Sequence, residues 1–154
     1  LPLAACMNDM LHFALSLPII FILLFIYGRP LFAAYWYGIP ALLLIQLILT
    51  YGLCLAVSSI TLFFRDLERL TAISVMLLMY FTPIIYPESM IPEAYKHFLY
   101  LNPQALIIIN WRQLLYEGHL NASYLAISLG YAVVSFAIGQ WVYSKLSWKF
   151  AEIV

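Results

Sequence analysis

The chain has 154 residues, of which 66% are hydrophobic, 17% aromatic and 9% charged, and its mean hydropathy is +0.97. Soluble domains carry about 25% charged residues, so this composition excludes a water-soluble globular domain and indicates an integral membrane protein. The seven basic and seven acidic residues cancel and form no run, which excludes a nucleic-acid-binding surface and an acidic tail. We therefore expect membrane lipid and other membrane-facing surfaces as partners, and no nucleic acid.

The first residues, Leu1-Pro2-Leu3, carry neither the basic region nor the small-residue cleavage site of a signal peptide. We interpret the chain as the C-terminal part of a longer protein. The two cysteines, Cys6 and Cys54, lie in apolar runs without CxxC spacing. They are predicted to be ordinary core residues rather than parts of a disulfide or a metal site.

The sequence predicts an all-α membrane fold with four transmembrane helices. A helix needs about 20 residues to cross the hydrocarbon core, and the third span reaches this length only with its charged flank. Pro2 suits the first turn of the first span, and Asn121 is a plausible N-cap of the fourth. The predicted spans cover about 2–27, 38–64, 67–86 and 122–144.

A segment of about 87–118 separates the third and fourth spans, and Pro87, Pro92 and Pro103 interrupt it. Pro92 is predicted to begin a helix that runs to about Leu101. Asn102 then caps a second helix with Pro103 in its first turn. That second helix would be about 20 Å long, too short to cross the membrane. We therefore predict two short re-entrant or interfacial helices that form an external insert.

The distribution of lysine and arginine predicts the orientation. If the polar turn between the second and third spans is cytoplasmic, four basic residues lie inside and three outside, as the positive-inside rule favours. They are Arg65, Arg69, Lys145 and Lys149 inside, and Arg29, Lys96 and Arg112 outside.

Motifs for catalysis and nucleotide binding are absent from the sequence. It contains no GxxxxGK[ST], GxSxG, HExxH or SxxK pattern, so we expect no cofactor in this chain and an energy source elsewhere. Asp9 and His12 are the nearest approach to an acid–base pair. We interpret them as polar residues close to a membrane face or facing other helices.

Three further patterns each leave room for interpretation. The charged turn at 63–69 is either a solvated connection, with Asp66 as an N-cap of the next helix, or a surface that a partner contacts. Aromatic residues concentrate at the predicted outer end and form either an interfacial girdle or a passage for sugars. They are Tyr80, Phe81, Tyr86, Tyr95, Phe98, Tyr100, Trp111 and Tyr116. Small residues four apart predict close helix packing. These pairs are Gly52 with Ala56, Ala126 with Gly130, and Ser135 with Gly139.

Several short motifs in fixed order resemble the permease subunit of ABC type-2 polysaccharide exporters, which export O-antigen, capsule or teichoic acid chains. The motifs are Phe64-Arg65-Asp66-Leu67, Thr82-Pro83-Ile84-Ile85-Tyr86-Pro87, Ile91-Pro92-Glu93, Leu101-Asn102-Pro103, Trp111-Arg112 and Lys149-Phe150-Ala151-Glu152. The first residues also resemble the start of the family's third span. The resemblance therefore covers the whole chain, as the C-terminal part of one transmembrane domain.

The resemblance implies a six-span subunit of the bacterial inner membrane that forms a homodimer around a channel. A separate ATP-binding cassette subunit would bind ATP and Mg²⁺, and a lipid-linked polysaccharide would be the substrate. Candidate coupling residues in the cytoplasmic turn are Arg65, Asp66, Glu68 and Arg69. Candidate residues of the channel or outer gate are Tyr80, Pro83, Tyr86, Asn102, Pro103, Trp111 and Arg112.

Three other functions remain open at the level of sequence. A permease of the same superfamily could move a drug or another lipid. A membrane-embedded enzyme acting on lipid-linked sugars would need carboxylates or histidines that converge at one membrane face, and the spans supply only Asp9 and His12. A scaffold without transport would not need the irregular backbone that the prolines of the insert predict.

Overall fold

A computed structural model of the chain describes residues 2–30, 32–64, 66–84 and 86–149, and within these ranges every regular element is a helix. The predicted all-α class is confirmed. The long helices are α1 (Pro2–Ile26), α2 (Tyr35–Thr61) and α6 (Ala122–Leu146). Among the described residues, these three are long and apolar enough to cross a membrane, with the first counted from Leu3 to Ile26.

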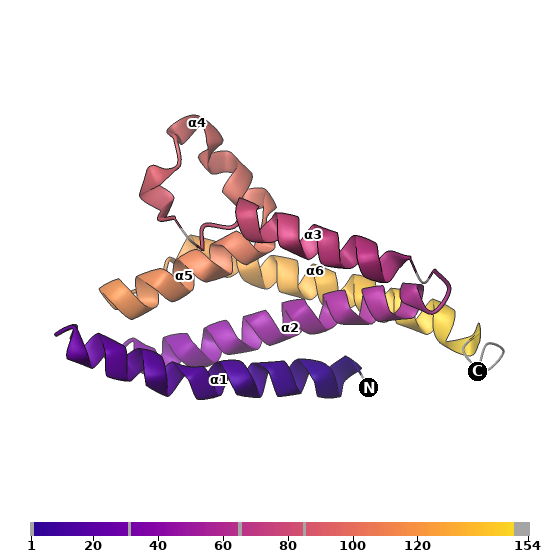
Figure 1. Cartoon of the computed structure of the whole chain (residues 1–154), viewed down its shortest axis with the longest axis horizontal. Coiled ribbons are helices and arrows are strands. Elements are labelled where there is room, and N and C mark those ends of the chain that lie inside the picture. The colour runs from indigo at the N-terminus through magenta and orange to yellow at the C-terminus, as the bar shows by residue number, and fades with distance from the viewer. Residues whose placement is uncertain (1, 31, 65, 85, 150–154) are drawn as a thin grey trace.

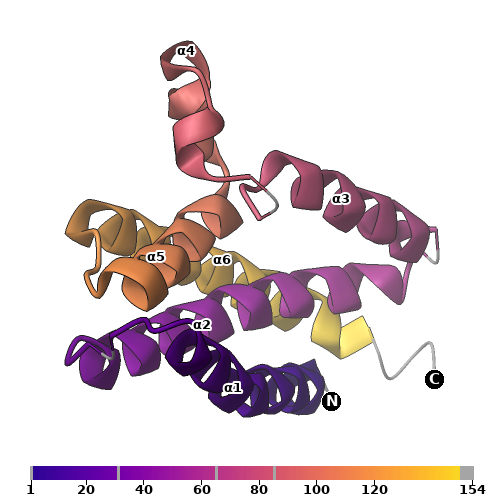
Figure 2. The same ribbon diagram turned by 60° about the vertical axis from the view of Figure 1, so that its left-hand side comes forward.

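Helices α2 and α6 form the most closely packed pair of the structure, and both views show them side by side (Figures 1 and 2). A Cβ added at Gly139 of α6 would lie 2.2 Å from the carbonyl oxygen of Gly52 on α2. Only residues without a side chain allow backbones to approach this closely. The predicted packing role of Gly52 and Gly139 is confirmed, whereas a Cβ added at Gly130 would meet no atom of another described helix within 4 Å.

Helix α1 covers the other side of α2, and α5 (Pro103–Glu117) completes a shared apolar core. Core residues come from α1, from α2 and the residue before it, from α5 and from α6. They are Leu17, Ala34, Tyr35, Leu42, Ile45, Leu49, Ile107, Trp111, Leu114 and Ala132. The core thus lies between α1, α2, α5 and α6, and α3 (Leu67–Phe81) contributes no buried residue to it.

The predicted bounds of the first and fourth spans agree with α1 and α6 within two residues, but those of the second do not. Helix α2 begins at Tyr35 rather than at residue 38, and it ends at Thr61 rather than at 64. Tyr35, Trp36 and Tyr37 therefore form its first turn instead of preceding it. None of these aromatic residues is a helix breaker, so nothing in the sequence requires the helix to begin after them.

The third predicted span is shorter in the structure than 67–86. Helix α3 has 15 residues and ends at Phe81, because Thr82 adopts an extended conformation (φ −97°, ψ 133°). Thr82 precedes Pro83, whose ring disfavours the α conformation in the residue before it. At 1.5 Å per residue α3 is about 22 Å long, and it is not among the helices long enough to span by themselves.

The predicted insert consists of short pieces followed by α5. The pieces are the 3₁₀ turn η1 (Glu88–Met90), α4 (Glu93–Lys96) and the 3₁₀ turn η2 (His97–Leu101). The single helix expected from Pro92 to Leu101 is thus one α-helical turn continued by a 3₁₀ helix. We call residues 87–101 the arm. It protrudes from the bundle between the end of α3 and the beginning of α5 (Figures 1 and 2).

The connections of the bundle are divided between its two ends. Both views place the N-terminus, the α2–α3 connection and the end of α6 at one end, and the α1–α2 and α5–α6 connections at the other (Figures 1 and 2). At the second end, the guanidinium of Arg29 lies 5.7 Å from the ring centre of Tyr116. Arg69 and Lys145 share the first end, as the sequence-based orientation requires. We call these the α2–α3 end and the α5–α6 end.

Candidate functional site

The segment that follows α3 is fixed by hydrogen bonds to α5 and its cap. The Thr82 hydroxyl donates to the carbonyl oxygen of Leu78 (2.6 Å) and accepts a hydrogen bond from Nδ2 of Asn102 (2.9 Å). Thr82 is 2% exposed and Asn102 8% exposed, and Pro83 between the helix end and the arm is fully buried. Burial of this polar pair is favourable because each group has a partner.

Asn102 has a second role as the predicted N-cap of α5, which is confirmed. Its Oδ1 accepts hydrogen bonds from the backbone N–H groups of Gln104 (3.0 Å) and Ala105 (3.4 Å). Pro103 occupies the first turn of α5, where its missing N–H leaves no donor unpaired. One amide side chain therefore fixes both the end of α3 and the start of α5.

Arg112 holds the same segment from further along α5. Its Nη1 donates to the carbonyl oxygen of Tyr86 and its Nη2 to that of Ile84, both at 3.0 Å. The Tyr86 hydroxyl donates in turn to the carbonyl oxygen of Tyr80 (3.2 Å). The rigid fork of a guanidinium suits two acceptors two residues apart.

Most of the predicted channel or gate residues thus meet in one place. We call this group the outer junction; its residues are Tyr80, Thr82, Pro83, Ile84, Tyr86, Asn102, Pro103 and Arg112. Three separate sequence motifs contribute to it. Ile85, which belongs to the second motif, lies outside the described residues.

An apolar cavity of about 540 Å³ lies between the end of α3 and the arm. Its lining residues come from both sides of the outer junction. They are Leu78, Phe81, Tyr86, Ile91, Tyr95, Phe98, Leu99, Leu101 and Asn102. Of the predicted gate residues, Tyr86 and Asn102 line this cavity. Tyr95 and Phe98, which also line it, stack with ring centres 6.4 Å apart.

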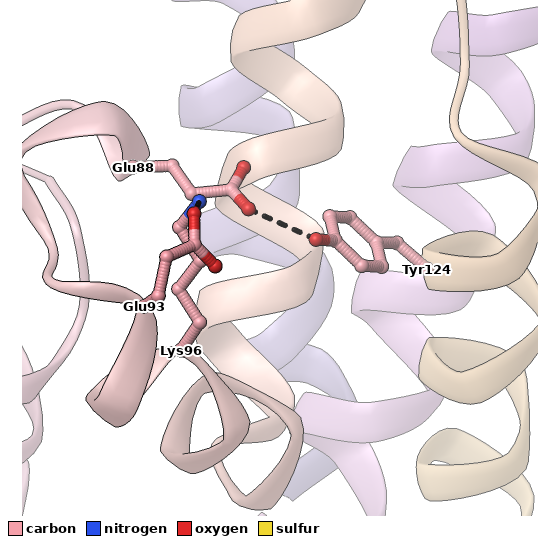
Figure 3. Close-up of polar contacts among 4 residues, drawn as sticks. All are labelled: Glu88, Glu93, Lys96 and Tyr124. Carbon is pink, nitrogen blue, oxygen red and sulfur yellow. Dashed lines mark hydrogen bonds and ion pairs between the residues drawn. The ribbon is translucent and has the colours of Figure 1, made fainter.

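Two tyrosine hydroxyls of α6 bind the arm. Tyr124 donates to Oε1 of Glu88 (2.9 Å), and Figure 3 shows the carboxylate of Glu88 directed at that phenol. Tyr131 donates to the carbonyl oxygen of Tyr100 (2.7 Å). The sequence analysis did not identify these pairs, because 36 and 31 residues separate the partners.

The arm also carries an internal ion pair. The Lys96 ammonium lies 2.6 Å from Oε1 of Glu93 (Figure 3). This hydrogen bond raises the pKa of Lys96, and the negative charge of Glu88 adds to the increase. The glutamate side chain is 87% exposed, so the pair contributes little to stability.

Trp111 lies apart from the outer junction although the sequence groups it with Arg112. It is 7% exposed, its Nε1 donates to Oε1 of Gln46 on α2 (3.0 Å), and its ring meets that of Phe13 edge-on. Trp111 therefore packs α5 against α1 and α2. Gln46 was a signal that the sequence analysis missed, since an amide inside a charge-free span needs a partner.

The other predicted site lies at the α2–α3 end. Asp66, Glu68 and Arg69 are exposed and line a surface hollow with Ala72. Asp66 occupies the N-cap position of α3 but makes no capping hydrogen bond, because its own backbone is helical (φ −66°, ψ −17°); the predicted cap is wrong. Arg65 and residues 150–154 lie outside the described residues.

The structure assembles no catalytic or metal centre from the residues it describes. Asp9 and His12 are exposed on α1. No group of three or more His, Cys, Asp or Glu side chains in the described ranges is placed to hold a metal ion. Cys6 and Cys54 are free thiols; Cys6 is buried, as predicted for a core residue, and Cys54 is half-buried.

Comparisons with known proteins identify similar chains among curated sequences. Two O-antigen export system permease proteins RfbA of Klebsiella pneumoniae are 38% and 39% identical over the whole chain, and one of Myxococcus xanthus is 29% identical. The chain spans about 60% of the length of these curated relatives. No family model matches the chain, and no solved structure does.

The relatives are named as permeases rather than as enzymes. The resemblance to polysaccharide export permeases that the short motifs predicted is confirmed: over its whole length this chain is similar to O-antigen export system permease proteins.

Proposed function

We propose that this chain is the C-terminal part of the transmembrane domain of a permease subunit, in an ATP-driven exporter of O-antigen-type, lipid-linked polysaccharide. The observation that carries the proposal is the similarity of all 154 residues to curated O-antigen export permeases. Three long apolar helices support a multi-pass position in a membrane. We place the subunit in the bacterial inner membrane, as the resemblance to polysaccharide export permeases implies.

Helix α3 and the segment after it would form the fourth crossing. The 15-residue helix covers about 22 Å of the roughly 30 Å hydrocarbon core, so the turn that follows it at 82–84 would also lie at membrane depth. Non-helical backbone is tolerated at membrane depth only where protein or a water-filled cavity surrounds it. The burial of Thr82 and Pro83 and the bonds from Arg112 to two carbonyl oxygens meet this condition.

The arm and α5 would form a re-entrant insert. Tyr131, which binds the arm, is the tenth residue of α6, about 14 Å from the helix start. Helix α5 begins near this depth at Asn102 and returns to the α5–α6 end. Charged side chains on the arm avoid lipid, so this face would line the channel or the dimer interface.

The α2–α3 end would face the cytoplasm and contact the ATP-binding cassette subunit. Exposed Asp66, Glu68 and Arg69 are its candidate contacts, with Arg65 beside them. ATP and Mg²⁺ would be bound by that partner, since this sequence has no phosphate-binding loop. A second copy of the permease subunit would complete the channel.

The test is complementation in cells. A bacterial strain that lacks its O-antigen permease receives the full-length subunit together with its ATP-binding partner, and surface O-antigen is measured by antibody binding. We expect surface polymer with the intact pair and none when the P-loop lysine of the partner is replaced. Polymer that stays inside the cell with both intact proteins, at normal membrane abundance, would contradict the proposal and favour a drug or another lipid as substrate.

A further inference from the structure

The arm is attached to the rest of the chain along a narrow line. Its apolar anchor is a small cluster in which Leu99 packs with Ala105 and Ile109, and Ile91 and Tyr124 lie against it. The other large apolar residues of the arm remain exposed, including Met90 (72%), Tyr95 (60%) and Phe98 (54%). A segment with so few buried contacts opens at low free-energy cost.

Hollows lie on both sides of this attachment. The apolar cavity described above separates the arm from α3. A second, polar cavity of about 320 Å³ separates it from α5 and is lined by charged and amide groups. They are Glu88, Lys96, Arg112, Gln113 and Glu117, with Pro87 and Ile109. The arm therefore rests on its anchor cluster rather than on a packed surface.

The residues just before and just after the arm, which we call its roots, are held by hydrogen bonds, in contrast to its middle. Arg112 holds the backbone at Ile84 and Tyr86, just before the arm. Asn102 holds Thr82 and the start of α5 just after it. A segment with fixed roots and a weakly attached middle can pivot about those roots without disturbing the helices.

Among the described residues, the hydroxyls of Tyr124 and Tyr131 donate hydrogen bonds that join the arm to α6. They lie seven residues apart, which is two helical turns, so both phenols stand on one face of α6. One binds the first turn of the arm at Glu88 and the other its last turn at Tyr100. The ring of Tyr124 also meets that of Tyr100 edge-on, 5.7 Å between centres.

We propose that Tyr124 and Tyr131 are positioning residues that pin the arm against α6, and that the arm pivots away from α6 when these two hydrogen bonds break. Pivoting would change the width of the apolar cavity that the arm lines together with α3. The role of this movement rests on the proposed export function, because we infer that the arm must move before a polymer can leave through the channel. The pinning itself is independent of the substrate.

The first experiment measures opening directly. Leu99 is 6% exposed beneath the arm, so Leu99→Cys reports release of the arm through its reaction rate with a membrane-impermeant maleimide. The full-length subunit is used with its ATP-binding partner, after Cys6→Ala and Cys54→Ala. Adding Tyr124→Phe and Tyr131→Phe removes only two oxygen atoms. Loss of one hydrogen bond corresponds to about fivefold in an equilibrium, so labelling should accelerate about fivefold or more.

Tyr95→Phe is the matched control. It also removes one phenol oxygen, from the arm itself, and this hydroxyl makes no hydrogen bond to a residue that the structure describes. We expect its labelling rate to equal that of the parent. An unchanged rate in the Tyr124→Phe, Tyr131→Phe variant, at equal membrane abundance, would overturn the proposal.

The second experiment locks the arm. In Glu88→Cys with Tyr124→Cys, the shorter side chains leave a gap that a reducible bifunctional methanethiosulfonate reagent can bridge. Cross-linking should stop export of O-antigen, and reduction should restore it. Export at the uncross-linked rate would overturn the pivot. If the unmodified subunit exports no polymer, the proposed function fails, while the maleimide rates still decide whether the two tyrosines pin the arm.

Discussion

The α2–α6 pair and the α3–arm region are both rich in apolar residues but bury very different fractions of them. Eight of the 27 residues of α2 are buried, including Gly52, whereas none of the 15 residues of α3 is. The pair is held by direct backbone contact at Gly52 and Gly139, and the α3–arm region by a few hydrogen bonds from Asn102, Arg112 and two tyrosines. Close packing makes a rigid region, and sparse bonding leaves a movable one.

Breaking the close packing of α2 and α6 should have the largest effect on stability. In Gly139→Ala the new methyl group meets the Gly52 carbonyl oxygen at 2.2 Å, and a backbone atom cannot move aside without separating the helices. We expect a loss of about 3 kcal/mol, at the upper end of overpacking costs. Thermal unfolding of the purified full-length subunit measures it.

Gly130→Ala is the control for that substitution. It makes the same chemical change on the same helix, and its Cβ meets no atom within 4 Å. Alanine favours a helix over glycine by about 1 kcal/mol, so this variant should unfold at the same temperature or higher. Equal destabilisation by both substitutions would show that the α2–α6 contact does not set the stability.

Asn102→Ala should loosen the outer junction with a smaller loss. It removes the α5 cap, worth about 1 kcal/mol, and leaves the Thr82 hydroxyl without its donor. We expect about 2 kcal/mol in total. Asn102→Asp retains the capping oxygen but loses the Nδ2 donor, so it separates the two contributions in the same unfolding measurement. Identical results for alanine and aspartate would contradict the capping role.

Arg112→Lys should affect the arm more than the bundle. An ammonium is a compact donor that does not reproduce the fork binding Ile84 and Tyr86. We expect about 1 kcal/mol of lost stability and faster maleimide labelling of Leu99→Cys, because one root of the arm is freed. Labelling at the parent rate would show that the arm does not depend on this root.

Asp66→Asn should have the smallest effect on stability, because the carboxylate is exposed and caps nothing. Such surface changes stay within about 0.5 kcal/mol. If the α2–α3 end couples to the ATP-binding subunit, O-antigen export should nevertheless fall at equal membrane abundance. Export at the parent level for Asp66→Asn and for Arg65→Lys would leave this turn as a plain connection.

Local sequence signals predicted the parts of the fold that local chemistry determines. Asn102 and Asn121 each cap a helix through their own side-chain oxygen, as expected from their position before Pro103 and Ala122. The end of α3 was placed too late, because the pattern of apolar residues continues through Pro83 to Tyr86 while the backbone does not. Proline constrains the preceding residue, and that rule would have moved the boundary to Phe81.

Pairings between distant residues could not be predicted in the same way. Helices in this chain are apolar on all sides, so no polar face indicates which side packs inward. Gly130 and Gly139 carry the same small-residue signal, yet only Gly139 contacts another helix. Trp111 and Arg112 are adjacent in one motif but point to α2 and to the segment before the arm, since neighbours on a helix face different directions. The motif predicted the place of Arg112 in the site, but not that of Trp111.

The Gly52–Gly139 crossing has a mechanical consequence. Where two backbones touch without intervening side chains, neither helix can slide along or roll over the other unless the pair separates, so α2 and α6 behave as one lever. A displacement of the α2–α3 end would therefore be transmitted to the α5–α6 end as a tilt of α2 and α6 together. Spin labels on α2 and α6 should therefore keep a constant separation through a transport cycle, while a label on the arm moves relative to both.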